Sequence, residues 1–481
     1  MNIKRFFRIL LCFVLVVPSA SCKDSGPEDP VLVLSASEII FSAEGGEFVI
    51  TMECNDQWSI SNPASSWLQL SLTSGNSGTF TIKFTAEDVN ETGATRYTVL
   101  NVNSQNGQSR RIEVSQTATI YPSYNGSPKA PDATGMNSTA VELASKINLG
   151  WNIGNTMEAP GGETGWGNPL ITEDYVKFVK YCGFNAIRIP CAWNWYHVDN
   201  PATAHINTDW LNRVKEVVGY CIDNDLYVLL NIHWDNGWLE NNCTRVKQDS
   251  VNARQKAFWE QIATVMRDFD EHLMFASSNE PNTDDAGQME VLLSYHKAFI
   301  DAVRSTGGHN TYRVLVIQGA AELLAVEDFP TDPTPDRIMY ETHIYTPYQF
   351  TALDEDADWG KMYYYWGAGH HSTIEPGRNA EWGEEEELLE EFEHLKTQFV
   401  DKGIPVLLGE YGAYRRGNGA NVPKDPETHN ASVDYWITYV THQALAHGVK
   451  PFFWDTGNAL DRQDNTVLDQ RTIDAIIAGR Q

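Results

Sequence analysis

The sequence has few cysteines, and none of them falls in a metal-binding pattern. Seven cysteines occur in 481 residues, with no CxxC pair and no HExxH-type motif. Once Cys12 and Cys22 of the N-terminal segment are set aside, an odd number remains, which does not suit a disulfide framework. The common zinc and thiol-redox motifs are therefore excluded, and we expect no metal and no other cofactor.

Positive charge is also scarce. Lys and Arg number 35 against 64 Asp and Glu, which gives a formal net charge of −29. Nucleic acids and anionic membrane surfaces both attract clustered Lys and Arg, so the balance argues against either partner and suits a neutral substrate. Fifteen Trp and twenty Tyr are present. Such aromatic side chains fill a large core, or they stack on sugar rings in a carbohydrate-binding cleft.

The N-terminal apolar run is too short to cross a membrane permanently. ILLCFVLVV follows the basic MNIKRFFR, as in an export signal. The next residues, PSASC, resemble a bacterial lipoprotein box in which Cys22 becomes the lipidated first residue, although Ser19 replaces the usual Leu. KDSGPEDP resembles the export signal of Bacteroidetes surface lipoproteins. We expect residues 1–21 to be a signal peptide and Cys22 to anchor the protein at the cell surface, on the outer membrane; secretion or a periplasmic location is the alternative.

Residues 31–119 contain short β-like runs in which apolar and polar residues alternate. EFVITMEC, GTFTIKFTAE and RYTVLNVNS are examples, with Gly, Asn and Ser between them. This pattern predicts a small all-β sandwich of about 90 residues. The stretches FSAEGGEFVI, DQWSIS, SSWLQLS, TSGNSGTFTIKF and the terminal EVSQT resemble the BACON domain, an immunoglobulin-like module of Bacteroidetes surface enzymes. Trp58 and Trp67 could bind glycan there, but we expect core packing and a spacer role.

The remaining chain alternates strand-like and helix-like patterns after a linker. Residues 120–136 are rich in Pro, Gly, Ser and Asn and predict the linker. In residues 137–481 eight strand candidates follow in order: INLGWNIG, FNAIRIP, LYVLLNIH, LMFASSNE, RVLVIQG, RIMYETHIY, IPVLLGEYG and KPFFWDTG. Amphipathic stretches between them, such as RQKAFWEQIATVMRDF, predict a (β/α)8 TIM barrel rather than a doubly wound sheet. The acidic run 384–387 is expected at a helix N-terminus, where the helix dipole favours negative charge.

Polar and aromatic side chains end nearly every predicted strand. In a TIM barrel the carboxyl ends of the strands carry the active site, so these side chains are expected at one rim. They are Asn152, Arg188, His233, Asn279 with Glu280, Gln318, His343 with Tyr345, Glu410 and Trp454. One such residue could cap a strand, but so many on one rim indicate a function.

Glu280 and Glu410 are a carboxylate pair suited to the cleavage of glycosidic bonds. One carboxyl group must protonate the leaving oxygen while the other attacks or stabilises the anomeric carbon. Arg188, His343 and Tyr345 are expected to keep Glu410 ionised and oriented. The pKa of Glu280 is expected to be raised, because that side chain is partly desolvated beside the Glu410 anion.

Motifs along residues 137–481 resemble the catalytic domain of glycoside hydrolase family 5. They are GWNIGNTMEA, FNAIRIP, NIHW, SSNEP, HIYTP, LLGEYG and FFWDTG, in family order. The resemblance implies a retaining glycosidase with Glu280 as acid/base and Glu410 as nucleophile. The resemblance also implies the substrate-binding residues Arg188, His233, Asn279, His343, Tyr345 and Trp454. The pattern of strand ends adds Asn152 to this group. Asn279 is expected to donate to a sugar 2-hydroxyl, and Trp454 to offer its face to the ring.

Within the family, GWNIGNTMEA with TGWGNP and NIHWDNGWLENN is most similar to the subfamily 4 endo-β-1,4-glucanases, which include many xyloglucanases. Two residues depart from the family pattern: Trp234 replaces a frequent second His, and Asn282 a frequent Arg. We expect a monomer that cleaves internal bonds of plant cell-wall β-glucans, above all xyloglucan. Endo-β-1,4-mannanase and mixed-linkage glucanase are the alternatives within this class. A catalytically silent glycan-binding surface protein is the alternative outside it.

Further aromatic residues are candidates for sugar platforms or for the core. Five tryptophans on expected loops belong to this group: Trp166, Trp193, Trp195, Trp238 and Trp366. The stretch GKMYYYWGAGHH, residues 360–371, is an aromatic loop after the sixth strand that could line the positive subsites. A long aromatic cleft would suit xyloglucan, because its xylosyl branches need width.

Overall fold

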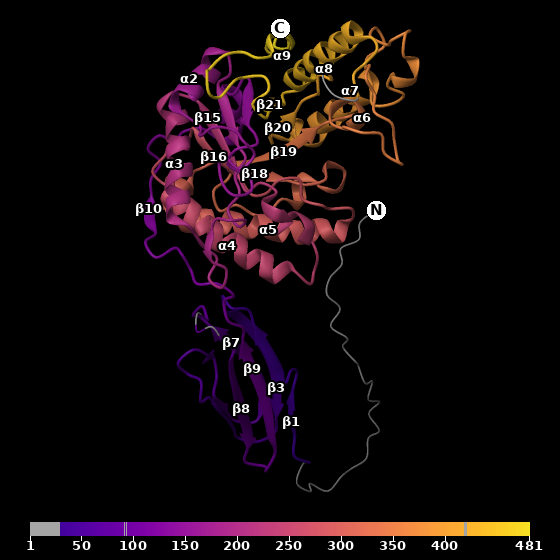
Figure 1. The fold of residues 1–481 in the computed structure, drawn as a ribbon. Coiled ribbons are helices and arrows are strands. Elements are labelled where there is room, and N and C mark those ends of the chain that lie inside the picture. Colours follow the sequence, from indigo (N-terminus) through magenta and orange to yellow (C-terminus); the bar gives the residue numbers. More distant parts are fainter. Residues whose placement is uncertain (1–28, 91, 93, 418–420) are drawn as a thin grey trace. The chain divides into compact units, whose positions relative to one another are not determined.

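The computed structural model describes residues 29–90, 92, 94–417 and 421–481, which form two compact units (Figure 1). The first unit ends at Thr119 and the second begins at Ile120. The expected signal peptide and Cys22 lie outside the described residues, so the lipid anchor stays a prediction. No helix within the described residues combines the length and the apolar character that a membrane crossing requires.

The first unit is a sandwich of two β-sheets, with the strand orders β1-β3-β7-β5 and β2-β9-β8-β4-β6. The strands are β1 Leu32–Leu34, β2 Glu38–Phe41, β3 Gly46–Cys54, β4 Trp58–Ser61, β5 Gln69–Leu70, β6 Ser74–Gly75, β7 Gly78–Ala86, β8 Arg96–Ser104 and β9 Ser109–Gln116. Alternate side chains point inward, so Ile50, Met52 and Cys54 of β3 are buried. Trp58 is buried in the same core and Trp67 packs against it. Both tryptophans therefore serve packing, and the BACON assignment stays a prediction.

Residues 120–136, the predicted linker, belong to the second unit and pack against the rest of it. Strand β10 (Lys129–Pro131) pairs with β17 (Gly307–Gly308), and the Tyr124 hydroxyl donates to the carbonyl of Thr203. The polar backbone of this segment finds hydrogen-bond partners within that unit. Composition alone does not reveal those partners.

Eight parallel strands close into the barrel that the sequence predicts. They are β11 Gly150–Ile153, β12 Ala186–Ile189, β15 Tyr227–Asn231, β16 Leu273–Ala276, β18 Leu315–Gln318, β19 Ile338–Ile344, β20 Val406–Tyr411 and β21 Lys450–Asp455. Each lies within one of the predicted segments. β21 closes the barrel against β11, with Asn152 and Trp454 as register partners. Strands covered on both faces read as nearly continuous apolar runs, which is why the sequence predicts them well.

Helices surround the barrel (Figure 1). They are α1 Ala140–Lys146, α2 Glu173–Tyr181, α3 Thr208–Asp223, α4 Gln248–Val265, α5 Ala286–Ser305, α6 Tyr348–Thr351, α7 Glu385–Gln398, α8 Pro426–Ala446 and α9 Gln470–Gly479. A short hairpin of β13 (Val198–Asn200) and β14 (His205–Ile206) adds to the rim loops. The acidic run begins α7, as predicted, with Glu384 as its N-cap. Within the described residues the cysteines are free thiols: Cys54, Cys182, Cys191, Cys221 and Cys243.

Candidate active site

The pairing of β19 and β20 places His343 beside Glu410 at the carboxyl ends of the strands. Thr342 is the register partner of Leu408 and His343 the partner of Glu410, so Gly409 is an extra residue in β20. A β-bulge of this kind bends the strand and re-aims the side chain that follows it. That side chain here is Glu410.

Arg188 lies at the centre of the site and is fully buried. Its Nη1 donates to Oε1 of Glu410 at 2.7 Å and to Oδ1 of Asn152 at 3.0 Å. Its Nη2 donates to Oδ1 of Asn279 at 2.7 Å, and its Nε lies 2.8 Å from Oε1 of Glu341. A buried cation is tolerated only with such partners. One guanidinium therefore joins side chains from several strand ends.

Asn152 and Arg188 lie beneath the floor of the site, which corrects their expected role as direct substrate contacts. Both are 0% exposed. The amide nitrogen of Asn152 donates to the carbonyls of Gly409 at 2.8 Å and Phe452 at 3.2 Å. Side chains without exposed surface cannot touch a sugar, so these two residues position the residues above them.

Glu341 is a residue of the site that the sequence analysis missed. It is fully buried, and its Oε1 lies 2.8 Å from Nε of Arg188 and 3.2 Å from Nε2 of His343. Burial alone would raise the pKa of Glu341, but the charge of Arg188 and the hydrogen bond and charge of His343 lower it. The sequence did contain a signal for this residue. Glu341 lies two residues before His343, and residues two apart in a strand face the same side.

His343 lies between carboxylates. Its Nδ1 is 2.8 Å from Oε1 of Glu280 and 3.7 Å from Oε1 of Glu410, while its Nε2 faces Glu341. Burial alone would lower the pKa of His343, but the charge of Glu410 and the hydrogen bonds to Glu280 and Glu341 raise it to about 9. At neutral pH the ring is therefore an imidazolium that donates from both nitrogens.

The pKa of Glu280 is shifted in the direction opposite to the one expected from the sequence. The side chain is 55% exposed. Desolvation by burial raises the pKa of Glu280. The hydrogen bond and charge of His343, together with the charge of Arg188, outweigh this effect, so the pKa is lowered. The sequence analysis placed Glu280 beside the Glu410 anion and could not place the imidazolium between them.

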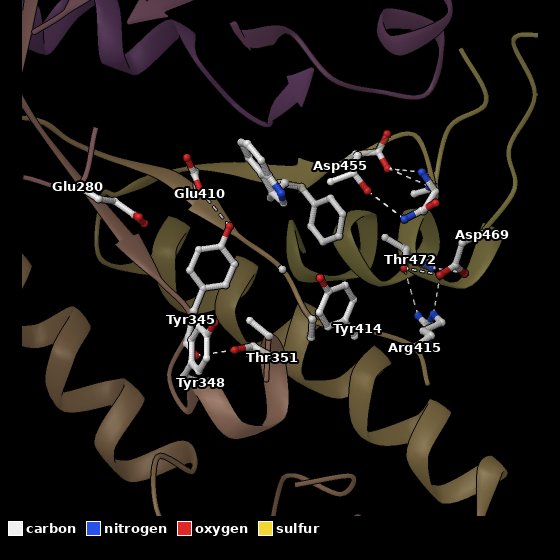
Figure 2. A pocket seen from close by; sticks show the side chains of 18 residues that line it. Glu280, Tyr345, Tyr348, Thr351, Glu410, Tyr414, Arg415, Asp455, Asp469 and Thr472 are labelled. Carbon is white, nitrogen blue, oxygen red and sulfur yellow. Dashed lines mark hydrogen bonds and ion pairs between the residues drawn. The ribbon is translucent and has the colours of Figure 1, made fainter. Parts of the chain in front are cut away.

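The carboxyl groups of Glu280 and Glu410 lie close together. One oxygen of each, together with a ring nitrogen of His343, lie within 4.8 Å of one another. Carboxyl groups about 5–5.5 Å apart suit direct attack by one of them, whereas about 6.5–9.5 Å leaves room for a water molecule. The Tyr345 hydroxyl donates to Oε2 of Glu410 at 3.0 Å (Figure 2). The spacing therefore suits a covalent intermediate on Glu410.

The same three side chains have a spacing that could hold a cation, and they are the one such group within the described residues. Distance along the sequence hides this arrangement, because His343 is far from both Glu280 and Glu410. A histidine binds a metal only as neutral imidazole, whereas the raised pKa of His343 favours the protonated ring, and Arg188 pairs with Glu410. The absence of a catalytic metal stays a prediction.

Asn279, His233 and Trp454 complete the expected shell. Arg188 holds Oδ1 of Asn279, which turns the amide so that its nitrogen is the group left to donate. His233 lies parallel to Trp454, with the rings 5.8 Å apart and inclined by 10°. Burial, and then the charges of Arg188 and His343, hold the pKa of His233 well below its usual range, so the ring is neutral.

A cavity of about 510 Å³ extends from the two glutamates (Figure 2). It passes Tyr345 and Trp454 and reaches Arg415 and Asp469, whose charged groups lie 2.6 Å apart. Its size is typical of ligand pockets. Neutral polar and aromatic side chains form much of its wall, and these include Tyr348, Thr351, Tyr414, Phe453, Thr456, Asn458 and Thr472.

Several aromatic residues that were candidates for the cleft belong to the core. Trp193, Trp238 and Trp366 are buried, whereas Trp166 is exposed and Trp195 half-buried. Residues 362–367 of the stretch 360–371 also pack inward, and a small separate cluster contains Met362, Tyr364 and Tyr365. The buried aromatic side chains therefore serve the core rather than a subsite, and composition does not show which way a loop folds. Trp234, which follows His233, is 47% exposed.

Comparison with known proteins gives relatives over nearly the whole chain. The chain is 31% identical to the xyloglucan-specific endo-β-1,4-glucanase BoGH5A of Bacteroides ovatus, across 98% of this chain and 96% of that protein. A solved Bacteroides ovatus GH5 xyloglucanase in complex with a XXXG heptasaccharide superposes with a TM-score of 0.69 at 30% identity, covering 94% of this chain and 100% of that one.

A second solved structure matches the barrel unit. It is XEG5B, a GH5 xyloglucan-specific β-1,4-glucanase from a ruminal metagenomic library in complex with XXLG, with a TM-score of 0.65 and 35% identity over 71% of this chain and 96% of that one. Residues 152–460 match the family model described as Cellulase (glycosyl hydrolase family 5). This match spans more than half of the chain and contains both glutamates of the site. The chain therefore belongs to glycosyl hydrolase family 5.

Proposed function

We propose that the protein is a retaining endo-β-1,4-glucanase and that xyloglucan is its main substrate. The observation that carries the proposal is the approach of the Glu280 and Glu410 oxygens to within 4.8 Å of each other. A carboxylate pair at this spacing cleaves a glycosidic bond in two steps through a covalent intermediate. A catalytically silent glycan-binding protein would have no need for a buried arginine and a phenol aimed at one of the two carboxylates.

Glu410 is the nucleophile of the proposed mechanism. Arg188 donates to one of its oxygens and Tyr345 to the other, and these donors bind the anionic form of the carboxylate. Glu410 attacks the anomeric carbon, the bond from that carbon to the leaving oxygen breaks, and a glycosyl ester forms. The fixed donors hold the attacking oxygen in place before the substrate arrives.

Glu280 is the acid and then the base. It gives its proton to the leaving oxygen, and it later takes a proton from the water that hydrolyses the ester, so the anomeric configuration is retained. Before the first step Glu280 must be protonated, although His343 lowers its pKa in the free enzyme. A bound sugar removes the exposed half of the side chain from water, and this desolvation raises a carboxyl pKa.

Two considerations support xyloglucan as the substrate. Two of the relatives reported above are described as xyloglucan-specific, and a GH5 xyloglucanase among them was solved with a XXXG heptasaccharide. The cavity of about 510 Å³ beside the glutamates also offers space next to the main chain of a glucan. Endo-β-1,4-mannanase and mixed-linkage glucanase activity are the alternatives within the class.

We further propose that Cys22 carries a lipid anchor and that the β-sandwich is a spacer between that anchor and the enzyme. The basic and apolar N-terminal segment with its small-residue processing site supports this placement. Fractionation of cells that express the full chain tests it. Wild type should appear in the outer membrane and Cys22→Ala should not; an identical distribution of the two would contradict the anchor.

Reducing-sugar release from xyloglucan, carboxymethyl cellulose, glucomannan and barley β-glucan tests the activity. We expect xyloglucan to be cleaved fastest and Glu280→Ala to lower the rate about 10²–10⁴-fold, the usual contribution of a general acid. Glu410→Ala should abolish the reaction. Wild-type rates in either variant, or an inverted anomeric product by NMR, would contradict the mechanism, and a clear preference for the mannan substrate would contradict the assignment to xyloglucan.

A further inference from the structure

The backbone of Glu280 has an unusual conformation. Its φ is +46°, in the left-handed region that residues other than glycine seldom adopt. Such a conformation carries strain, and it persists only where surrounding contacts hold it. The contacts around Glu280 therefore decide where its carboxyl group points.

Hydrogen bonds hold the segment from Asn279 to Asn282 at several points, and the Asn282 side chain also donates to Oδ1 of Asn241 at 2.6 Å. Arg188 donates to the Asn279 side chain at 2.7 Å, and the amide of Asn282 donates to the carbonyl of Glu240 at 3.0 Å. Between them, the backbone N–H of Glu280 donates to Oε1 of Gln318 at 2.6 Å. Gln318 therefore holds the backbone of the strained residue, and His343 contacts its carboxylate at 2.8 Å. The remaining contacts hold the neighbouring residues.

Gln318 is in turn held firmly. It ends β18 and is buried, and its backbone carbonyl lies 2.7 Å from Nε2 of His296 on α5. Nδ1 of the same ring lies 2.7 Å from Oγ of Ser277, three residues before Glu280. Burial lowers the pKa of His296 to about 4, so the neutral ring donates from Nε2 and accepts from the serine hydroxyl. His296 thus links the ends of β16 and β18.

We propose that Gln318 is a positioning residue for the acid step. Its side-chain oxygen keeps Glu280 in the left-handed conformation that aims the carboxyl group at the leaving oxygen, and His296 with Ser277 keeps Gln318 in place. This inference rests on the proposed function, in which Glu280 is the acid. The sequence pattern marks Gln318 only as the end of a strand.

The effect of losing this bond is specific to proton donation. Without the acceptor, the backbone of Glu280 relaxes toward negative φ, and its carboxyl group moves away from the leaving oxygen. A misplacement of about 1 Å costs on the order of 10²-fold in rate. Glu410 is held by Arg188 and Tyr345 from other strands, so the attack on the anomeric carbon keeps its geometry.

Gln318→Leu in the full chain tests the proposal with two aryl β-cellobiosides. Dinitrophenolate leaves without a proton, whereas phenolate needs one, and kcat/KM reports the step that forms the glycosyl ester. We expect kcat/KM for the phenyl substrate to fall about 10²-fold, with little change for the 2,4-dinitrophenyl substrate. The matched control is Gln261→Leu, because Oε1 of buried Gln261 accepts the backbone N–H of Ile206 at 2.8 Å, away from the site.

The Gln261→Leu control should change kcat/KM for both substrates by the same factor. Ser277→Ala removes the hydroxyl that orients His296 while leaving Gln318 intact. It should lower kcat/KM less than Gln318→Leu does, and only for the phenyl substrate. If Gln318→Leu fails to fold by circular dichroism, Ser277→Ala decides the question in the same way. Equal losses on both substrates, or no loss, would overturn the positioning role. A wild-type enzyme that cleaves neither aryl glycosides nor polysaccharide would instead overturn the proposed function.

Discussion

Replacing Gly409 by Ala probes the contact between the β20 bulge and the buried Glu341 anion. A Cβ at Gly409 would lie 2.1 Å from Oε1 of Glu341 and 2.8 Å from its Cδ. Ordinary van der Waals contact begins at 3.4 Å, so the two groups must separate by about 1.3 Å, the difference between 3.4 and 2.1 Å. Glu341 cannot turn aside freely, because Arg188 and His343 both hold it. The bulge must move instead, and it carries Glu410.

The expected loss follows from that displacement. A misplacement of about 1 Å in a reacting group lowers the rate on the order of 10²-fold, which is about 2.7 kcal/mol of barrier. KM should change little, since Glu341 and Gly409 lie beneath the substrate. Overpacking of a buried site costs about 1–3 kcal/mol of stability, and we therefore expect Tm to fall by roughly 2–10 °C.

Steady-state kinetics on an aryl β-cellobioside, with a thermal melt on the same preparation, measure both effects. Gly369→Ala is the matched control, because nothing lies within 4 Å of the added Cβ. That variant should keep the wild-type kcat and Tm. A Gly409→Ala enzyme with wild-type kcat would mean that the strand accommodates the methyl group without moving Glu410, and the packing argument would be refuted.

Two further predictions concern the groups around Glu410. Tyr345→Phe removes the hydroxyl that donates to Glu410 at 3.0 Å. Because a hydrogen bond to a charged group contributes about 1.5–3 kcal/mol, kcat should fall about 10- to 100-fold. An unchanged kcat would show that the bond does not act on the nucleophile. His343 makes stability depend on pH, because its folded-state pKa of about 9 lies above its ordinary 6.5. Its contribution is therefore complete below about pH 6.5 and is lost as the pH rises through about 9. In urea denaturation the stability gap between wild type and His343→Asn should shrink by up to about 3 kcal/mol over that interval, whereas a constant gap would contradict the raised pKa.

The barrel strands and their polar ends could be predicted because both leave local signals. Segments such as LYVLLNIH begin with an almost continuous apolar run, since barrel interior and helices cover both faces of the strand. The polar residue at each end then marks the rim where a parallel barrel exposes its loops. Glu280 and Glu410 follow from this pattern and from the chemistry of two carboxylates.

The partners across the barrel could not be predicted, because they depend on register and on which way loops fold. Glu341 meets Arg188 only after β12 and β19 have taken their places, and His343 reaches Glu280 from a different strand. The direction of the Glu280 pKa shift depends on that second contact and was therefore predicted wrongly. The inward packing of Tyr364 and Tyr365 likewise involves neighbours distant in the sequence: the Arg416 guanidinium lies over the Tyr364 ring, and the Tyr365 hydroxyl accepts the backbone N–H of Asp425.

The reach of the Arg188 guanidinium links activity to complete assembly of the barrel. Its partners belong to the first strand, the fourth and the sixth, and to the seventh through Glu410. A chain folded only as far as the middle strands would hold a buried cation without its counter-ions, which is strongly unfavourable. Docking of the sixth and seventh strands therefore both neutralises the interior and brings the nucleophile to the reaction centre. Hydrolysis of a glycoside then reports that these two strands have docked against the Arg188 guanidinium.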